Sequence, residues 1–253
     1  TISEESYRGS NRNQVFFYNP TQQMRPMSAQ DALAFCNEYH PIPSSVMTME
    51  SYLPSNKLFI AVNPQEAIRS GWVNPADSLP IVDKIPLSYG DKTYLTKGEL
   101  AVLDIITTNA HKRPVYFNTT VLPSYIPGIQ NYLRLEGMAL RIVPERAQGV
   151  QGLGIFGYGS MDIEKTYDAV MNLYEWGNFD KEDLFVDESY RPTQQSMRVS
   201  MTRLTNELMN RGDNARAAAV SNEYFKRFPH MNFPYDASVL NFIQVLATTD
   251  PEN

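Results

Sequence analysis

The chain has 253 residues, of which 42% are hydrophobic, 11% aromatic and 20% charged. This composition is ordinary for one or two folded domains and excludes an intrinsically disordered chain. The 22 basic and 28 acidic side chains give a net charge of −6, which argues against a general binder of nucleic acid or of anionic membranes. The single cysteine, Cys36, excludes an intrachain disulfide and a thiolate metal cluster.

The ends and the hydropathy of the chain give two further expectations. Thr1 is neither an initiator methionine nor the start of a signal peptide, so we expect an excised fragment or a processed product. No run of 18 apolar residues is present, so we expect no membrane-spanning helix within these residues.

The first half of the chain predicts short helices and strands after a polar, irregular beginning. Ser28 is placed to cap a helix, whose apolar face is formed by Ala32, Leu33, Phe35, Cys36 and Tyr39. Residues 57–62 are typical of a buried strand, and residues 81–87 indicate a second one that Pro86 interrupts.

The clearest local signal is a capping box, in which Thr96 and Glu99 predict a helix that begins at Lys97 and ends near Asn109. Residues 114–118 then indicate a strand. A second helix is predicted from Pro127, ending at Gly137, and residues 138–143 indicate a further strand. Helices and strands that alternate at this spacing favour an α/β fold, a partly parallel sheet flanked by helices, over residues 1–148.

Residues 149–160 hold five glycines, and they include the letters of a dinucleotide-binding motif at Gly152, Gly154 and Gly157. That motif requires a strand that ends at its first glycine, whereas Pro144 ends the preceding strand several residues earlier. We therefore interpret 149–160 as a flexible linker without a cofactor.

Only helices are predicted after the linker, over residues 161–253. Apolar residues repeat at helical spacing over 163–174 and 197–208, and Gly212 ends the second of these helices. Asn214 is placed to cap a partner helix that ends before Pro229, and a last helix is expected over 237–247. The pair around Gly212 resembles one tetratricopeptide hairpin, without the further copies that a solenoid needs.

No catalytic, cofactor-binding or metal-binding residue is predicted. His40, His111 and His230 lie far apart without a zinc-ligand spacing, and no nucleophile elbow is present. The cationic junction at Lys112 and Arg113 leaves three interpretations open: a structural role, contact with an anion, or docking of a partner. Because the pair lies where a strand begins, we favour a structural role, in which Arg113 forms a buried ion pair with Asp104 or Glu136.

Residues 103–117, LDIITTNAHKRPVYF, resemble the LDII-x-x-N-x-x-KRPIYF signature of the bacterial domain of unknown function 2723 family. Residues 52–54, 135–144 and 176–178 agree with the same family pattern, which covers about residues 50–235. One departure is Ala110-His111, where the family usually has a tryptophan before Lys-Arg-Pro. The charged junction and the family pattern give nine candidate ligand-binding or structural residues: Asp104, Asn109, Lys112, Arg113, Tyr116, Glu136, Arg141, Trp176 and Asn178.

Members of that family resemble protein O-mannosyltransferases, which are multi-pass membrane glycosyltransferases that use lipid-linked sugars. The resemblance implies a soluble C-terminal region, tethered at the periplasmic face of the inner membrane, whose partner is the membrane half of the same polypeptide. It implies a supporting role without catalysis, either packing on that half or recognising a glycan or protein acceptor, and no nucleic-acid partner. The alternative is a free-standing periplasmic module that binds a peptide or partner through the tetratricopeptide-like hairpin.

Overall fold

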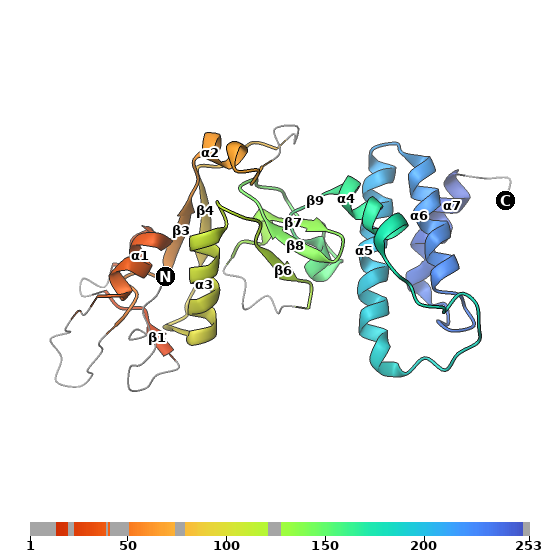
Figure 1. Ribbon diagram of the computed structural model, residues 1–253, viewed down its shortest axis with the longest axis horizontal. Helices are drawn as coiled ribbons and strands as arrows, with labels where there is room; N and C mark the ends of the chain where they lie inside the picture. Colours follow the sequence, from red (N-terminus) through yellow and green to blue (C-terminus); the bar gives the residue numbers. More distant parts are fainter. Residues whose placement is uncertain are drawn as a thin grey trace. The chain divides into compact units, whose positions relative to one another are not determined.

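The computed structural model describes residues 14–19, 23–38, 40, 51–73, 79–120 and 128–249 (Figure 1). The chain forms two compact units: unit 1 comprises Thr1–Leu133 and Arg141–Gln148, and unit 2 comprises Arg134–Leu140 and Gly149–Asn253. The division into 1–148, 149–160 and 161–253 used in the sequence analysis differs, because the strand-forming residues 134–140 group with the later part of the chain.

Unit 1 contains small separate sheets, of which one is antiparallel and one mixed. Strands β1 (Gln14–Phe16) and β5 (Tyr94–Thr96) pair antiparallel. A second sheet has the order β2 (Met27–Ser28), β3 (Lys57–Ala61), β4 (Lys84–Ser88), with β2–β3 parallel and β3–β4 antiparallel. Pro86 lies within β4 at the edge of this sheet, where its missing N–H interrupts no ladder.

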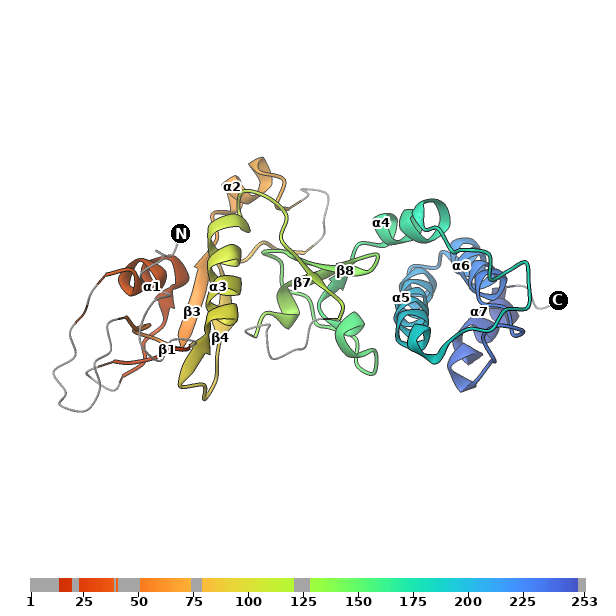
Figure 2. The ribbon, with the colours of Figure 1, turned by 60° about the horizontal axis from the view of Figure 1, so that its bottom comes forward.

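The helices of unit 1 begin where local side chains cap them. Ser28 Oγ accepts from Asp31 N ahead of α1 (Ala29–Cys36), and both halves of the Thr96–Glu99 capping box are present at α3 (Lys97–Asn109). These two predicted starts are confirmed; Tyr39 lies outside the described residues. Figures 1 and 2 show α3 alongside β3 and β4. Cys36 is buried on α1, and burial raises the pKa of its thiol to about 11, so the thiolate is scarce at neutral pH.

The predicted helix from Pro127 to Gly137 is wrong over residues 128–137, the part of it that the structure describes. A 3-10 turn at Gln130–Tyr132 leads into strand β7 (Leu133–Glu136), which a turn joins to β8 (Ala139–Ile142). Leu133 and Leu135 alternate with Arg134 and Glu136, a period of two that a hairpin uses and a helix does not. Gly137 has a φ of 63°, and a Cβ there would lie 2.5 Å from the Tyr174 hydroxyl, so both backbone and space require glycine.

Strand β8 is shared by the two units. In unit 1 its last residue, Ile142, donates from its N–H to Val115 O at 3.0 Å, next to strand β6 (Tyr116–Asn118). In unit 2, β7 pairs in parallel with β9 (Ser160–Met161). The α/β content expected from the sequence is therefore present, in small mixed sheets.

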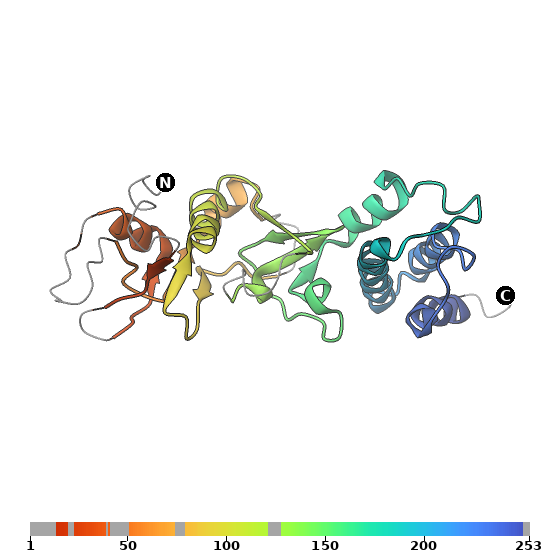
Figure 3. The ribbon, with the colours of Figure 1, turned by 90° about the horizontal axis from the view of Figure 1, so that it is seen from below.

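The rest of unit 2 is helical, as predicted. Its helices are α4 (Ile163–Asp168), which continues as a π-helical turn (Ala169–Leu173), α5 (Arg191–Asn210), α6 (Asn214–Arg227) and α7 (Leu240–Thr249). Figure 3 shows α5, α6 and α7, coloured cyan to dark blue, packed around a common core. Tyr224 and Phe242 stack in that core with ring centroids 4.2 Å apart. Asp213, rather than the expected Asn214, caps α6.

The glycine-rich segment is held in place by Arg203, whose side chain on α5 is almost fully buried. Its guanidinium donates to the carbonyl oxygens of Phe156, Tyr158 (3.0 Å) and Gly159 (2.7 Å). Val150 N also donates to Gly157 O at 2.7 Å, and a Cβ on Gly157 would lie 2.1 Å from Val150 O. The glycines therefore permit close backbone packing, which differs from the flexible linker expected from their number.

We expect Arg203→Ala to destabilise unit 2 by about 3 kcal/mol, because it leaves two buried carbonyls and one partly buried carbonyl without their donor. Urea unfolding followed by far-ultraviolet circular dichroism measures this loss. Arg211→Ala, at the exposed end of the same helix, serves as the matched control and should stay within about 0.5 kcal/mol of the unchanged chain. Equal effects of the two substitutions would contradict the role of Arg203.

The capping box also predicts an acid-sensitive step in unit 1. Burial alone would raise the pKa of Glu99, but hydrogen bonds from Lys92 and Thr96 outweigh it and hold the pKa below its ordinary value of 4.5. A depressed pKa in the folded state adds stability that is present above the unfolded value and lost as the pH falls through the folded value. We expect the unfolding free energy to drop below about pH 4.5, and Glu99→Gln to remove this dependence at a cost of about 1 kcal/mol at pH 7.

Candidate functional site

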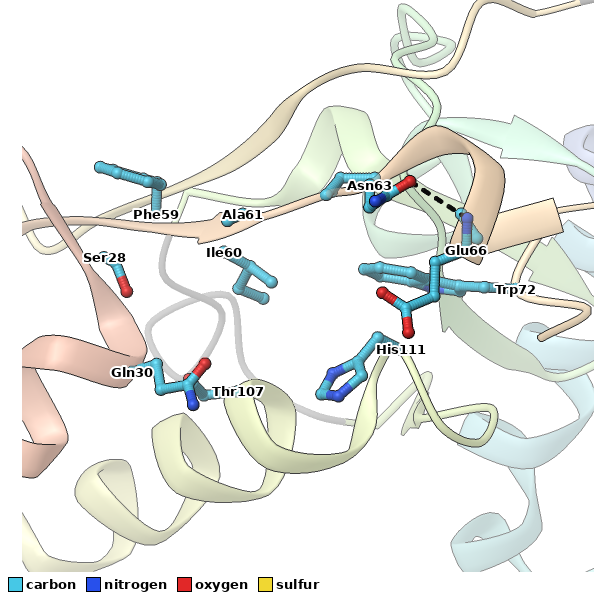
Figure 4. Close-up of a pocket in the computed structure, with 12 residues that line it drawn as sticks. Ser28, Gln30, Phe59, Ile60, Ala61, Asn63, Glu66, Trp72, Thr107 and His111 are labelled. Carbon is cyan, nitrogen blue, oxygen red and sulfur yellow. Dashed lines mark hydrogen bonds between the residues drawn. The ribbon is translucent and has the colours of Figure 1, made fainter. Parts of the chain in front are cut away.

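The main candidate site is a hollow of about 330 Å³ in unit 1, named here the β3–α3 hollow (Figure 4). Its volume lies at the lower end of the range of small-molecule sites, about 300–1,000 Å³. The lining residues are Ser28, Gln30, Phe59, Ile60, Ala61, Val62, Asn63, Glu66, Ala67, Trp72, Thr107 and His111. They come from β3, α3, the helix α2 (Pro64–Arg69) and the segments that adjoin them.

Local sequence explains how α2 presents Glu66 to this hollow. Asn63 Oδ1 accepts from the N–H groups of Gln65 (3.0 Å) and Glu66 (3.2 Å), and Pro64 occupies the first turn, where its missing N–H costs nothing. Figure 4 shows the Glu66 side chain extending toward the segment after α3 that carries His111, whose ring is turned away from the carboxylate. A carboxylate and an imidazole therefore both line the hollow.

Trp72 forms a fixed wall of the hollow. Its indole Nε1 donates to Ile142 O at 3.0 Å, and the side chain is only 4% exposed. In return, the buried Arg141 side chain donates to Gly71 O at 2.8 Å. The two side chains thus join the turn after α2 to strand β8 and fix the wall.

A second hollow of about 280 Å³, the α1–α3 hollow, has Gln30, Thr107 and His111 in common with the first. Asp104 and Lys112 also line it, so the structure brings two of the sequence-based candidates to this wall. Asp104 Oδ1 accepts from Thr108 Oγ1 at 2.9 Å.

Thr107 is the unusual polar group at the wall that the two hollows share. The residue is 8% exposed, and its buried Oγ1 has no hydrogen-bond partner among the described residues. A buried hydroxyl without a partner costs about 1–3 kcal/mol, so such groups require an explanation.

The other candidates in unit 1 have structural contacts. Asn109 Nδ2 donates to Ile105 O, and its Oδ1 accepts from Arg113 Nε at 3.0 Å. Arg113 is exposed, so the prediction that it forms a buried ion pair is wrong. Its side chain instead bonds locally to Asn109, the last residue of α3. Tyr116 lies on β6 and is 45% exposed.

Three candidates belong to unit 2. Glu136 accepts from Lys165 Nζ at 2.9 Å, rather than from Arg113. Trp176 packs edge-on against Tyr174 and Phe228, and Asn178 accepts from Lys181 Nζ at 3.0 Å. These contacts are those of a packed core edge and of a surface turn.

Asn63, Glu66 and Thr107 are not among the residues predicted from the sequence, and His111 entered there as an isolated histidine without a zinc-ligand spacing and as a departure from a family pattern. Asn63-Pro64 is a readable helix start, and it was the signal available for α2. Nothing in the sequence marks Thr107, whose burial depends on packing between α1 and α3.

The described residues offer neither a metal site nor a membrane span. No trio of His, Cys, Asp or Glu side chains is placed to hold a metal ion within the described ranges. In the same part of the chain, no helix combines the length and the apolar content needed to cross a bilayer.

Comparison with known proteins gives one match. Residues 1–165 match the model of the family described as TMEM260-associated domain 2. No curated protein and no solved structure matches the chain.

We expect Asn63→Ala to destabilise the start of α2 by about 1 kcal/mol, because two amides lose their acceptor. Hydrogen exchange of the residue 65 and 66 amides measures this directly. Exchange should accelerate at these amides while the amides of α3, which retain the Thr96 cap, stay protected. Unchanged exchange at residues 65 and 66 would show that Asn63 does not hold Glu66 in place.

Proposed function

Since the chain belongs to the TMEM260-associated domain 2 family, we propose that it is an accessory region of a membrane glycosyltransferase-like protein, tethered at the periplasmic face of the inner membrane. In this proposal its partner is the membrane half of the same polypeptide, and it recognises an acceptor rather than catalysing transfer. The resemblance of residues 103–117 to the domain of unknown function 2723 signature supports the glycosyltransferase context.

One observation favours recognition of an acceptor over a role limited to packing on the membrane half. The signature-like segment supplies the wall that the two hollows of unit 1 share, through Thr107 and His111, and Asp104 and Lys112 extend it. A segment needed only to pack on another body has no reason to line two hollows that combine polar and apolar walls.

The alternative, a free-standing module that binds a peptide through a tetratricopeptide-like hairpin, has support in unit 2. A groove of about 550 Å³ runs along α6 and α7, lined by small and apolar side chains including Ala215, Ala218 and Ile243. Ile243 is 47% exposed, which suits an apolar partner. We place this second because the family match covers unit 1 in full and little of α4 onward.

The test is sugar transfer by the membrane-embedded full-length protein carrying Glu66→Gln. Loss of a hydrogen bond to a charged group costs about 1.5–3 kcal/mol, so transfer efficiency should fall about ten- to a hundredfold. Glu38→Gln, at the exposed end of α1 and outside both hollows, should leave transfer unchanged. The isolated chain should transfer nothing, and turnover by it would contradict the accessory role.

A further inference from the structure

We propose that the β3–α3 hollow binds an uncharged carbohydrate; this names the acceptor class for the recognition function proposed above and rests on it. Two properties of the hollow support this proposal: its charge and its mixture of polar and apolar walls.

The charges of the walls disfavour an ionic ligand. Among the described residues that line the β3–α3 hollow, the one carboxylate is that of Glu66, and none is a lysine or an arginine. Arg69, which does not line the hollow, donates to Glu66 Oε1 at 3.4 Å on the surface of α2. In the α1–α3 hollow Lys112 is accompanied by Asp104. A phosphate or carboxylate ligand would lack the cluster of cationic donors that such groups select, and it would meet a like charge at Glu66.

The polar walls instead supply separate donors and acceptors of the kinds that hydroxyl groups bond. The amide of Gln30, the hydroxyl of Ser28, the carboxylate of Glu66 and the imidazole of His111 stand around the opening (Figure 4). A sugar hydroxyl both donates and accepts, so it can bond each of these groups.

The β3–α3 hollow also has an apolar floor. Ile60, Val62, Ala67 and the fixed ring of Trp72 line the same hollow. A pyranose ring carries C–H faces between its hydroxyls, and those faces pack on aliphatic and aromatic side chains. A small amphipathic molecule with many hydroxyls matches both walls, whereas a purely apolar ligand would leave the polar groups unsatisfied.

The experiment is a nuclear magnetic resonance titration of the whole chain with the methyl glycosides of glucose, galactose, mannose and N-acetylglucosamine at millimolar concentration. Inorganic phosphate and a tetralysine peptide are titrated in parallel. We expect saturable shifts with at least one glycoside, centred on the amides of residues 60–67 and 107–111, and none there with phosphate or tetralysine. Saturable binding of either charged probe at these amides, or no glycoside response, would overturn the proposal.

Glu66→Gln tests whether the glycoside occupies this hollow. Loss of a hydrogen bond to a charged group costs about 1.5–3 kcal/mol, so glycoside affinity should fall about ten- to a hundredfold. Glu38→Gln, which lies outside both hollows, is the matched control and should leave glycoside affinity unchanged. Equal affinities of the two variants would place the glycoside elsewhere and overturn the proposal.

The two proposals fail separately. Glycoside binding that is lost in Glu66→Gln, together with undiminished transfer by the full-length Glu66→Gln protein, would keep the sugar site and reject acceptor recognition. Loss of transfer in the full-length variant without any glycoside binding would keep recognition and reject a carbohydrate as the ligand.

Discussion

Trp72 and Ile142 lie 70 residues apart, yet the indole of the first donates to the backbone of the second. Arg141, beside Ile142, donates back to the carbonyl of Gly71, beside Trp72. Each side chain therefore satisfies a backbone acceptor in the other segment, and both side chains belong to residues that are more than nine-tenths buried. The wall of the β3–α3 hollow, the turn that ends α2 and the last residues of β8 all depend on this exchange.

A fixed wall matters for recognition because a pre-formed site does not lose side-chain entropy when a ligand binds. Trp72 reaches the hollow in one orientation, since rotating its ring would break the bond to Ile142 O. The groups at the opening are different: Gln30 and Glu66 are exposed and belong to short helices. The hollow thus combines a rigid apolar floor with an adjustable polar rim.

The parts of the fold that the sequence predicts are the local ones. Ser28 and the Thr96–Glu99 pair act on amides three residues away, so their helices could be read from spacing. Gly137 was misassigned because a left-handed glycine serves a helix end and a hairpin turn equally well, and only the period of the preceding residues tells them apart. Arg203, Arg141 and Thr107 could not be assigned, since their partners, or the lack of one, are set by segments 44 to 70 residues away or by packing.

The tip of the β7–β8 hairpin has a consequence for dissecting the molecule. The N–H of Gly137 is bonded by Thr166 on α4, and its carbonyl oxygen accepts from Ser200 on α5 at 2.9 Å. Composition marks the glycine-rich segment as the natural place to cut the chain in two. A fragment that starts there would lack Gly137, and the side chains of Thr166 and Ser200, both buried, would face solvent or each other without it. The helical region therefore forms a compact unit only together with Arg134–Leu140, which precede the glycine-rich segment in the sequence. A fragment of this region is better started before β7.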